Sequence, residues 1–117
     1  MTEPKAVRRS VIAGSWYPGT EKSLTRTVDD YLSHVAPAPV SGRLLGLISP
    51  HAGYAYSGQT AAYAYRQLQS RVVDTVVILA PSHRAWMGDY AVSEENAYET
   101  PLGFVPLDQE LIAVLDE

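Results

Sequence analysis

Two histidines in this chain each follow an apolar run through a small residue and a proline. His51 ends the stretch "LLGLISPH", and His83 ends the stretch "VVILAPSH". Proline has no N–H to give to a sheet, so it fits the end of a strand. Because open α/β sheets hold ligands beyond the carboxyl ends of their strands, we expect both imidazoles at the same edge of one sheet. Imidazole nitrogen binds zinc, copper and iron, so the pattern predicts that the two histidines share a metal ion.

Two histidines do not complete a metal site, because zinc or non-haem iron takes at least one more protein ligand. Acidic residues after the second histidine offer carboxylates, although we favour a solvated acidic loop for them: Asp89, Glu94, Glu95 and Glu99. A hydrogen-bonded loop histidine is the alternative for each imidazole. His34 lies near the end of a predicted helix, where the dipole favours a cation, so we assign it a structural role.

A strand, a helix and a second strand are predicted to position the histidines. Residues 43–48 and 75–80 show almost no polar alternation, which is typical of strands covered on both faces in a parallel sheet. Between them we predict a helix over 58–69, with Ser57 as its N-cap. This order predicts a right-handed βαβ unit.

Two further helices are predicted outside this unit. Apolar residues recur at spacings of three and four over residues 21–35, after Thr20 as N-cap. A last helix is predicted after Asp108, and between the two we expect a short strand at 89–93 and a loop at 93–101. The last helix ends on two acids with no following glycine. We therefore expect a longer protein, of which residues 1–117 form a single domain.

Composition excludes several classes of function. The chain has 117 residues, a formal net charge of −4 and no cysteine. The acidic balance disfavours binding to nucleic acid or to an anionic membrane, and the lack of cysteine excludes disulfides and thiolate metal sites within this chain. No signal peptide, membrane span, phosphate-binding glycine loop or G-x-S-x-G motif is recognisable, so we expect a cytoplasmic protein.

Four motifs together resemble a known family. They are "AGSWYPG", "SPHAGYAYSG", "LAPSH" and "YETPLG", in that order, and the last is followed by an aspartate. The chain resembles the N-terminal half of the Memo-like family, whose prokaryotic members are called AmmeMemoRadiSam system protein B. The resemblance covers nearly the whole chain.

The resemblance implies an α/β fold like that of class III extradiol dioxygenases. This fold has three layers, with a mainly parallel sheet flanked by helices, and this chain would be a partial version of it. In the family, the matching histidines, here His51 and His83, line a metal pocket. The resemblance also places Trp16 and Tyr54 near this pocket, where we expect them to bind substrate. The implied cofactor is a divalent metal, Fe(II) ahead of copper or zinc. The implied ligand is a small molecule or a peptide, since a eukaryotic relative is described as binding phosphotyrosine peptides. A radical SAM protein is a further implied partner.

The chain departs from the family pattern in two ways. Arg84 stands where relatives often carry a second histidine. The family's other pocket residues, an Asp and a His of an "SSDF-x-H"-like motif, lie in a downstream half that this chain does not contain. Three functions follow: a non-haem iron oxidoreductase with an incomplete site, a non-catalytic peptide- or anion-binding module, or a piece that is inactive alone. In the last case a bare sheet edge would favour homo-oligomers.

Overall fold

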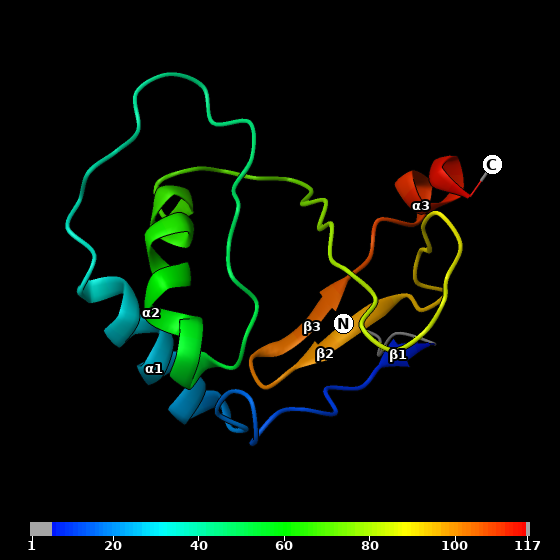
Figure 1. Ribbon diagram of the computed structural model, residues 1–117, viewed down its shortest axis with the longest axis horizontal. Coiled ribbons are helices and arrows are strands. Elements are labelled where there is room, and N and C mark those ends of the chain that lie inside the picture. The colour runs from blue at the N-terminus through cyan, green and yellow to red at the C-terminus, as the bar shows by residue number, and fades with distance from the viewer. Residues whose placement is uncertain (1–5, 117) are drawn as a thin grey trace. The chain divides into compact units, whose positions relative to one another are not determined.

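The computed structural model describes residues 6–116, and these form two compact units (Figure 1). One unit comprises residues 10–72. The other comprises residues 73–116 together with residues 6–9. Each is described below by itself.

The unit of residues 10–72 is built on two helices, of which the first is α1, Glu21–Ser33. The Oγ1 atom of Thr20 accepts a hydrogen bond from the Ser23 N–H at 3.3 Å, which satisfies one of the free donors of the first turn. Leu24 on this helix is buried, and so is Val35 just beyond it. The predicted N-cap is confirmed, and the helix ends two residues before the predicted end.

The second helix, α2 (Tyr54–Tyr65), begins four residues earlier than predicted and continues into a short 3₁₀ turn, η1 (Arg66–Leu68). Its N-cap is Gly53, so the prediction that Ser57 caps it is wrong. The Tyr54 N–H donates to the carbonyl oxygen of Trp16 at 2.8 Å, and this backbone contact replaces a side-chain cap. Ser57 instead lies buried inside the helix, where its hydroxyl donates to the Ala52 carbonyl.

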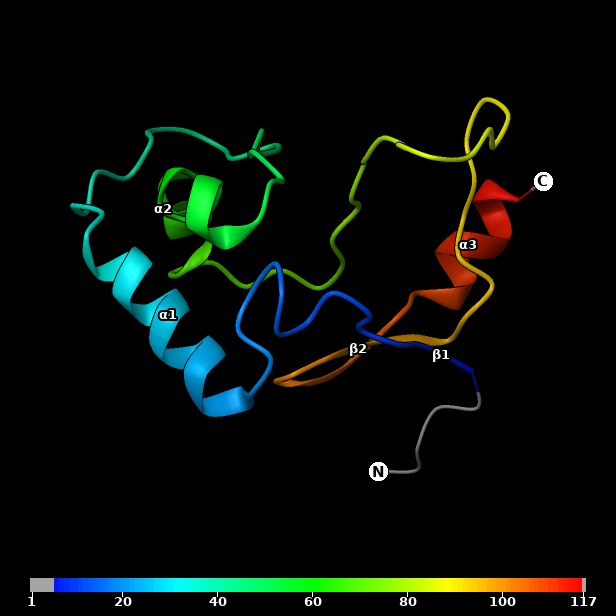
Figure 2. The same cartoon turned by 60° about the horizontal axis from the view of Figure 1, so that its bottom comes forward.

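Helices α1 and α2 pack against each other, as both ribbon views show (Figures 1 and 2). Gly58 makes the close approach: a Cβ atom there would lie 2.5 Å from Cε2 of Tyr31 on α1. Ala62, one turn further along α2, is buried. Small residues on one helix therefore leave room for an aromatic ring on the other.

The second unit holds a three-stranded sheet in the order β1–β2–β3. Strand β1 (Val7–Arg8) runs parallel to β2 (Ala97–Thr100), and β2 forms an antiparallel hairpin with β3 (Gly103–Pro106). Gly103 has φ +123°, a value that side chains rarely adopt and that the tight turn requires. The sheet corrects the prediction of a loop at 93–101, and the strand predicted at 89–93 is not formed.

Helix α3 (Gln109–Leu115) follows the sheet and confirms the predicted last helix. The Asp108 carboxylate accepts from the Leu111 N–H at 3.0 Å and from the Thr75 hydroxyl at 3.1 Å. The backbone N–H of Leu111, first, and the Thr75 hydroxyl lower the pKa of Asp108 below its usual value. Local capping is therefore enough to define where this helix begins.

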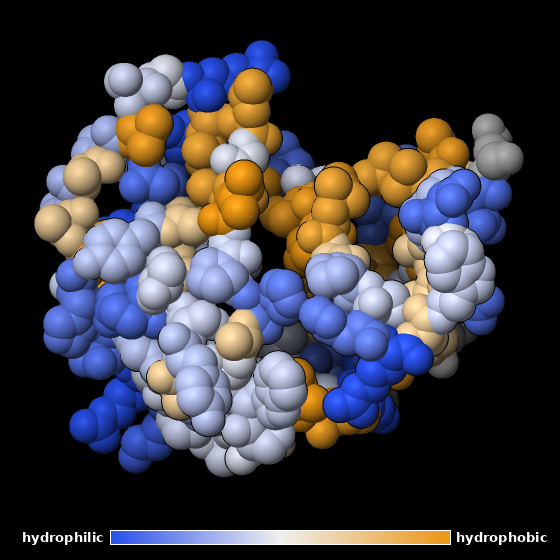
Figure 3. All heavy atoms as spheres, in the orientation of Figure 1, coloured by the Kyte–Doolittle hydropathy of each residue, from blue (hydrophilic) through white to orange (hydrophobic). Residues whose placement is uncertain are grey.

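The predicted strands at 43–48 and 75–80 are wrong for this structure, and the βαβ unit between them is not formed. Both segments lack regular secondary structure, and Ile48 is 100% and Leu79 94% exposed. A strand requires backbone hydrogen bonds to a neighbour, and within residues 6–116 neither segment has a ladder partner. Hydrophobic side chains accordingly lie at the molecular surface (Figure 3). The observed fold is α/β, with a small mixed sheet in place of the expected mainly parallel one.

No helix among the described residues is long and apolar enough to span a membrane.

Candidate functional site

A cavity of about 520 Å³ lies within the unit of residues 10–72. Five aromatic residues line it, from the loop before α1 and from both helices: Trp16, Tyr17, Tyr31, Tyr54 and Tyr65. The rest of the wall, apart from His51, is aliphatic or small: Ile12, Val28, Leu32, Pro50, Ala52, Ser57, Gly58, Ala61 and Ala62. Among the described residues, no Lys, Arg, Asp or Glu lines this cavity. It has the size and the apolar character of a small-molecule site.

Three of the four site residues predicted from the sequence line this one cavity: Trp16, His51 and Tyr54. His51 is brought there by the turn between the extended segment 43–48 and the first turn of α2. Trp16 is held beside it because its carbonyl oxygen accepts the Tyr54 N–H, and its side chain is 51% exposed. The cavity therefore combines two features: an imidazole, which can bind a metal ion, and a wall of aromatic side chains.

His83 belongs to the other compact unit. It lies in an exposed turn, in which the Ser82 hydroxyl donates to the Ala85 carbonyl at 2.7 Å. The pairing of His51 with His83 around one ion stays a prediction.

Tyr54 lies between two other tyrosines of the cavity wall. Its ring centroid is 5.6 Å from that of Tyr17 and 6.3 Å from that of Tyr31, with the planes tilted in both pairs. Burial raises the pKa of Tyr54 above its ordinary value, and the neighbouring phenols of Tyr17, Tyr65 and Tyr31 raise it further. Tyr54 is therefore a neutral phenol at physiological pH.

Tyr31 joins the two helices at the cavity through a pair of hydrogen bonds. Its hydroxyl donates to the Tyr54 carbonyl oxygen at 3.0 Å, and the Gln59 side-chain amide donates to the Tyr31 carbonyl oxygen at 2.9 Å. Tyr31 lies in the segment 21–35, which the sequence predicts as a helix, and it is not among the site residues predicted from the sequence. The signal that could have shown its role is composition, since the chain has 8 Tyr and 1 Phe, and a buried tyrosine needs a partner for its hydroxyl.

The described residues do not supply a complete metal site. No group of three or more His, Cys, Asp or Glu side chains lies close enough together in residues 6–116 to hold an ion. Two of the acidic candidates have other partners: Glu99 forms an ion pair with Arg9, and Glu95 accepts from the Ser93 hydroxyl, which lowers the pKa of Glu95. The donor set of the described residues does not by itself fit iron or zinc.

His34 has the local role that we expected. It is the C-cap residue of α1, and its Nδ1 atom lies 2.7 Å from the carbonyl oxygen of Asp30. It does not line the cavity.

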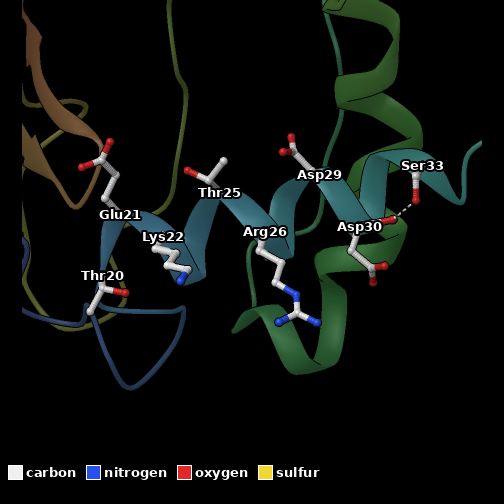
Figure 4. Close-up of a pocket in the computed structure, with 8 residues that line it drawn as sticks. All are labelled: Thr20, Glu21, Lys22, Thr25, Arg26, Asp29, Asp30 and Ser33. Atoms are coloured by element: carbon white, nitrogen blue, oxygen red, sulfur yellow. Dashed lines mark hydrogen bonds between the residues drawn. The ribbon is translucent and has the colours of Figure 1, made fainter.

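A second, larger depression of about 920 Å³ runs along the outer face of α1 (Figure 4). Its eight lining residues are all exposed and all come from α1 and its N-cap: Thr20, Glu21, Lys22, Thr25, Arg26, Asp29, Asp30 and Ser33. It carries both acids and bases, and a single helix face does not enclose a ligand. We therefore place the candidate site in the aromatic cavity.

Comparison with known proteins gives one consistent result. The sequence model of the family described as Memo-like protein matches residues 8–117. A MEMO1 family protein of Nitrosopumilus maritimus is 39% identical over 108 residues, which covers 89% of this chain and 39% of that protein. The Protein memo-1 homolog of Caenorhabditis elegans is 41% identical over 99 residues, covering 85% and 28% respectively. Protein MEMO1 of Mus musculus is 35% identical over 115 residues, covering 98% and 38%. The chain thus spans about two fifths or less of these relatives' length.

Proposed function

Because the chain belongs to the Memo-like protein family, we propose that it provides one part of a metal-binding pocket in which His51 is a ligand. The observation that carries the proposal is the position of His51 on an apolar cavity beside Trp16 and Tyr54. Further ligands would come from His83 and from protein outside this chain. The metal in this proposal is Fe(II), ahead of copper or zinc.

The proposed activity is that of a non-haem iron oxidoreductase acting on a small molecule. In this proposal the chain contributes to a three-layer fold like that of class III extradiol dioxygenases. It acts in the cytoplasm together with a radical SAM protein. The role of this chain's own residues is binding: His51 holds the metal, and Trp16 and Tyr54 orient the substrate and exclude water.

Metal titration with three histidine variants tests this proposal. The protein is purified without oxygen, and Fe(II) binding is measured for the wild type, His51→Ala, His83→Ala and His34→Ala. We expect His51→Ala to weaken Fe(II) binding by about tenfold or more. Removing a group that only supports a metal ligand already lowers metal affinity by about that factor, and removing the ligand itself should lower it at least as much. His34→Ala is the matched control and leaves binding unchanged. Iron binding that is indifferent to His51→Ala would contradict the proposal.

The alternative is a non-catalytic module in which the same cavity holds a peptide side chain without turnover. Its supporting observation is that the described residues form the cavity without a three-ligand metal group. A chelator distinguishes the two functions: ligand affinity that is unchanged by EDTA favours the module, and affinity that falls with metal removal favours the oxidoreductase.

A further inference from the structure

The walls of the aromatic cavity are rich in π-electron surface and carry no fixed charge among the described residues. Five rings come from Trp16, Tyr17, Tyr31, Tyr54 and Tyr65. Of the described residues that line the cavity, only His51 has a side chain that can become a cation. An aromatic ring face is electrostatically negative, so it attracts a cation and repels an anion.

Among the described residues, this cavity offers an anionic ligand no fixed positive charge. Carboxylate and phosphate groups are bound by Arg or Lys side chains or by free N–H groups at a helix N-terminus. No Arg or Lys lines the cavity in the described chain. At the start of α2, the Tyr54 N–H is already bonded to the Trp16 carbonyl oxygen at 2.8 Å. That carbonyl places a partial negative charge where an anion would have to bind.

A small organic cation suits the same walls. The rings of Tyr17 and Tyr31 lie beside that of Tyr54, with centroids 5.6 Å and 6.3 Å away. Burial, first, and the nearby phenols raise the pKa of Tyr54, so its ring stays neutral. The chain carries a formal net charge of −4, which favours the approach of cations. A volume of about 520 Å³ accommodates a trimethylammonium head group together with the chain that bears it.

We propose that this cavity binds a small quaternary ammonium group, held by the faces of Trp16 and the four tyrosines. Such a group occurs on free small molecules and on methylated lysine side chains, and both present the same head group. The inference goes beyond the proposed metal site, since it uses only the cavity walls and needs no bound metal.

Calorimetric titration with matched probes tests the inference. The chain, in buffer with EDTA, is titrated with choline, with trimethyllysine amide and with neohexyl alcohol, the uncharged carbon analogue of choline. We expect at least one cation to bind about tenfold more tightly than neohexyl alcohol, because only the charged head group gains the cation–π attraction. The tighter of the two cations identifies the source of the head group. Because EDTA is present, this result is independent of whether Fe(II) binds at His51.

Two tyrosines of α2 supply a matched pair of variants. Tyr65 lines the cavity and Tyr63 does not, and the two residues are similarly exposed, at 53% and 59%. We expect Tyr65→Leu to weaken cation binding by about fivefold and Tyr63→Leu to leave it unchanged. The inference would be overturned if neither cation binds more tightly than neohexyl alcohol, or if the two variants have equal effects.

Discussion

At the scale of single residues, Tyr54 links the sequence motif "SPHAGYAYSG" to the aromatic cavity. Its backbone N–H bonds to Trp16, its carbonyl oxygen accepts the Tyr31 hydroxyl, and its ring lies beside those of Tyr17 and Tyr31. The ring is partly buried, which disfavours the phenolate and raises the pKa. The residue therefore couples the protonation state of one phenol to the stability of the helix pair.

This coupling predicts a specific loss of stability at alkaline pH. Tyr54 has a folded-state pKa above its ordinary value of 10.0, so its contribution is fully present below pH 10.0 and is lost as the pH rises through the folded-state pKa. We expect the free energy of unfolding, measured in urea between about pH 8 and about pH 11, to fall less steeply for Tyr54→Phe than for the wild type. The phenylalanine keeps the ring and the backbone carbonyl.

Tyr56→Phe is the control for this measurement. Tyr56 lies on the same helix and is 90% exposed, so its surroundings change little on unfolding. This variant is expected to follow the wild type over the whole range. A Tyr54→Phe curve that coincides with that of the wild type would contradict the role given to Tyr54.

At the scale of elements, the cavity depends on how closely α1 and α2 approach. Gly58 allows the ring of Tyr31 to lie against α2, and the hydrogen bonds of Tyr31 with Tyr54 and Gln59 hold it there. Any side chain at position 58 must displace a ring that is anchored at its hydroxyl.

Gly58→Ala is therefore expected to destabilise the chain. Alanine gains about 1 kcal/mol over glycine inside a helix, but crowding the tethered ring costs about 1–3 kcal/mol. We expect a net loss of about 1 kcal/mol in the free energy of unfolding in urea. In a Tyr31→Leu background the clash is removed, so the same Gly58→Ala change becomes stabilising. Stabilisation by Gly58→Ala in both backgrounds would show that the contact with Tyr31 does not limit the packing.

At the scale of the whole molecule, two apolar segments lie exposed without strand partners in the described part of the chain. Residues 75–80 are rich in β-branched side chains, and Ile48 and Leu79 are almost completely exposed. Extended apolar segments with unpaired backbone groups are prone to pair with other chains. The homo-oligomer prediction takes its physical basis from these segments.

We expect the isolated chain to self-associate through residues 75–80. Replacing Leu79, which is 94% exposed, by lysine introduces charge repulsion between stacked chains and should shift sedimentation-velocity profiles towards the monomer. Val114→Lys is a control in the same unit, because Val114 is also exposed, at 67%, but lies on α3. An unchanged profile for Leu79→Lys, or an equal change for Val114→Lys, would contradict this role of the segment.

The sequence was sufficient where structure depends on neighbouring residues. The N-caps at Thr20 and Asp108 were correctly predicted, since a side chain that bonds a backbone N–H three residues later needs no distant partner. The family was likewise recognised from short motifs, and the comparison with known proteins confirmed it. The single domain over residues 1–117 and the metal shared by His51 and His83 stay predictions.

Tertiary structure decided what depends on distant partners. The start of α2 is set by the Trp16 carbonyl oxygen, and the cavity wall by tyrosines on separate elements, which no local pattern brings together. The apolar runs at 43–48 and 75–80 have the composition of strands, yet neither is a strand in the described chain. Composition expresses the tendency of a segment to be buried in a sheet, whereas a strand exists only when a second backbone supplies the hydrogen bonds.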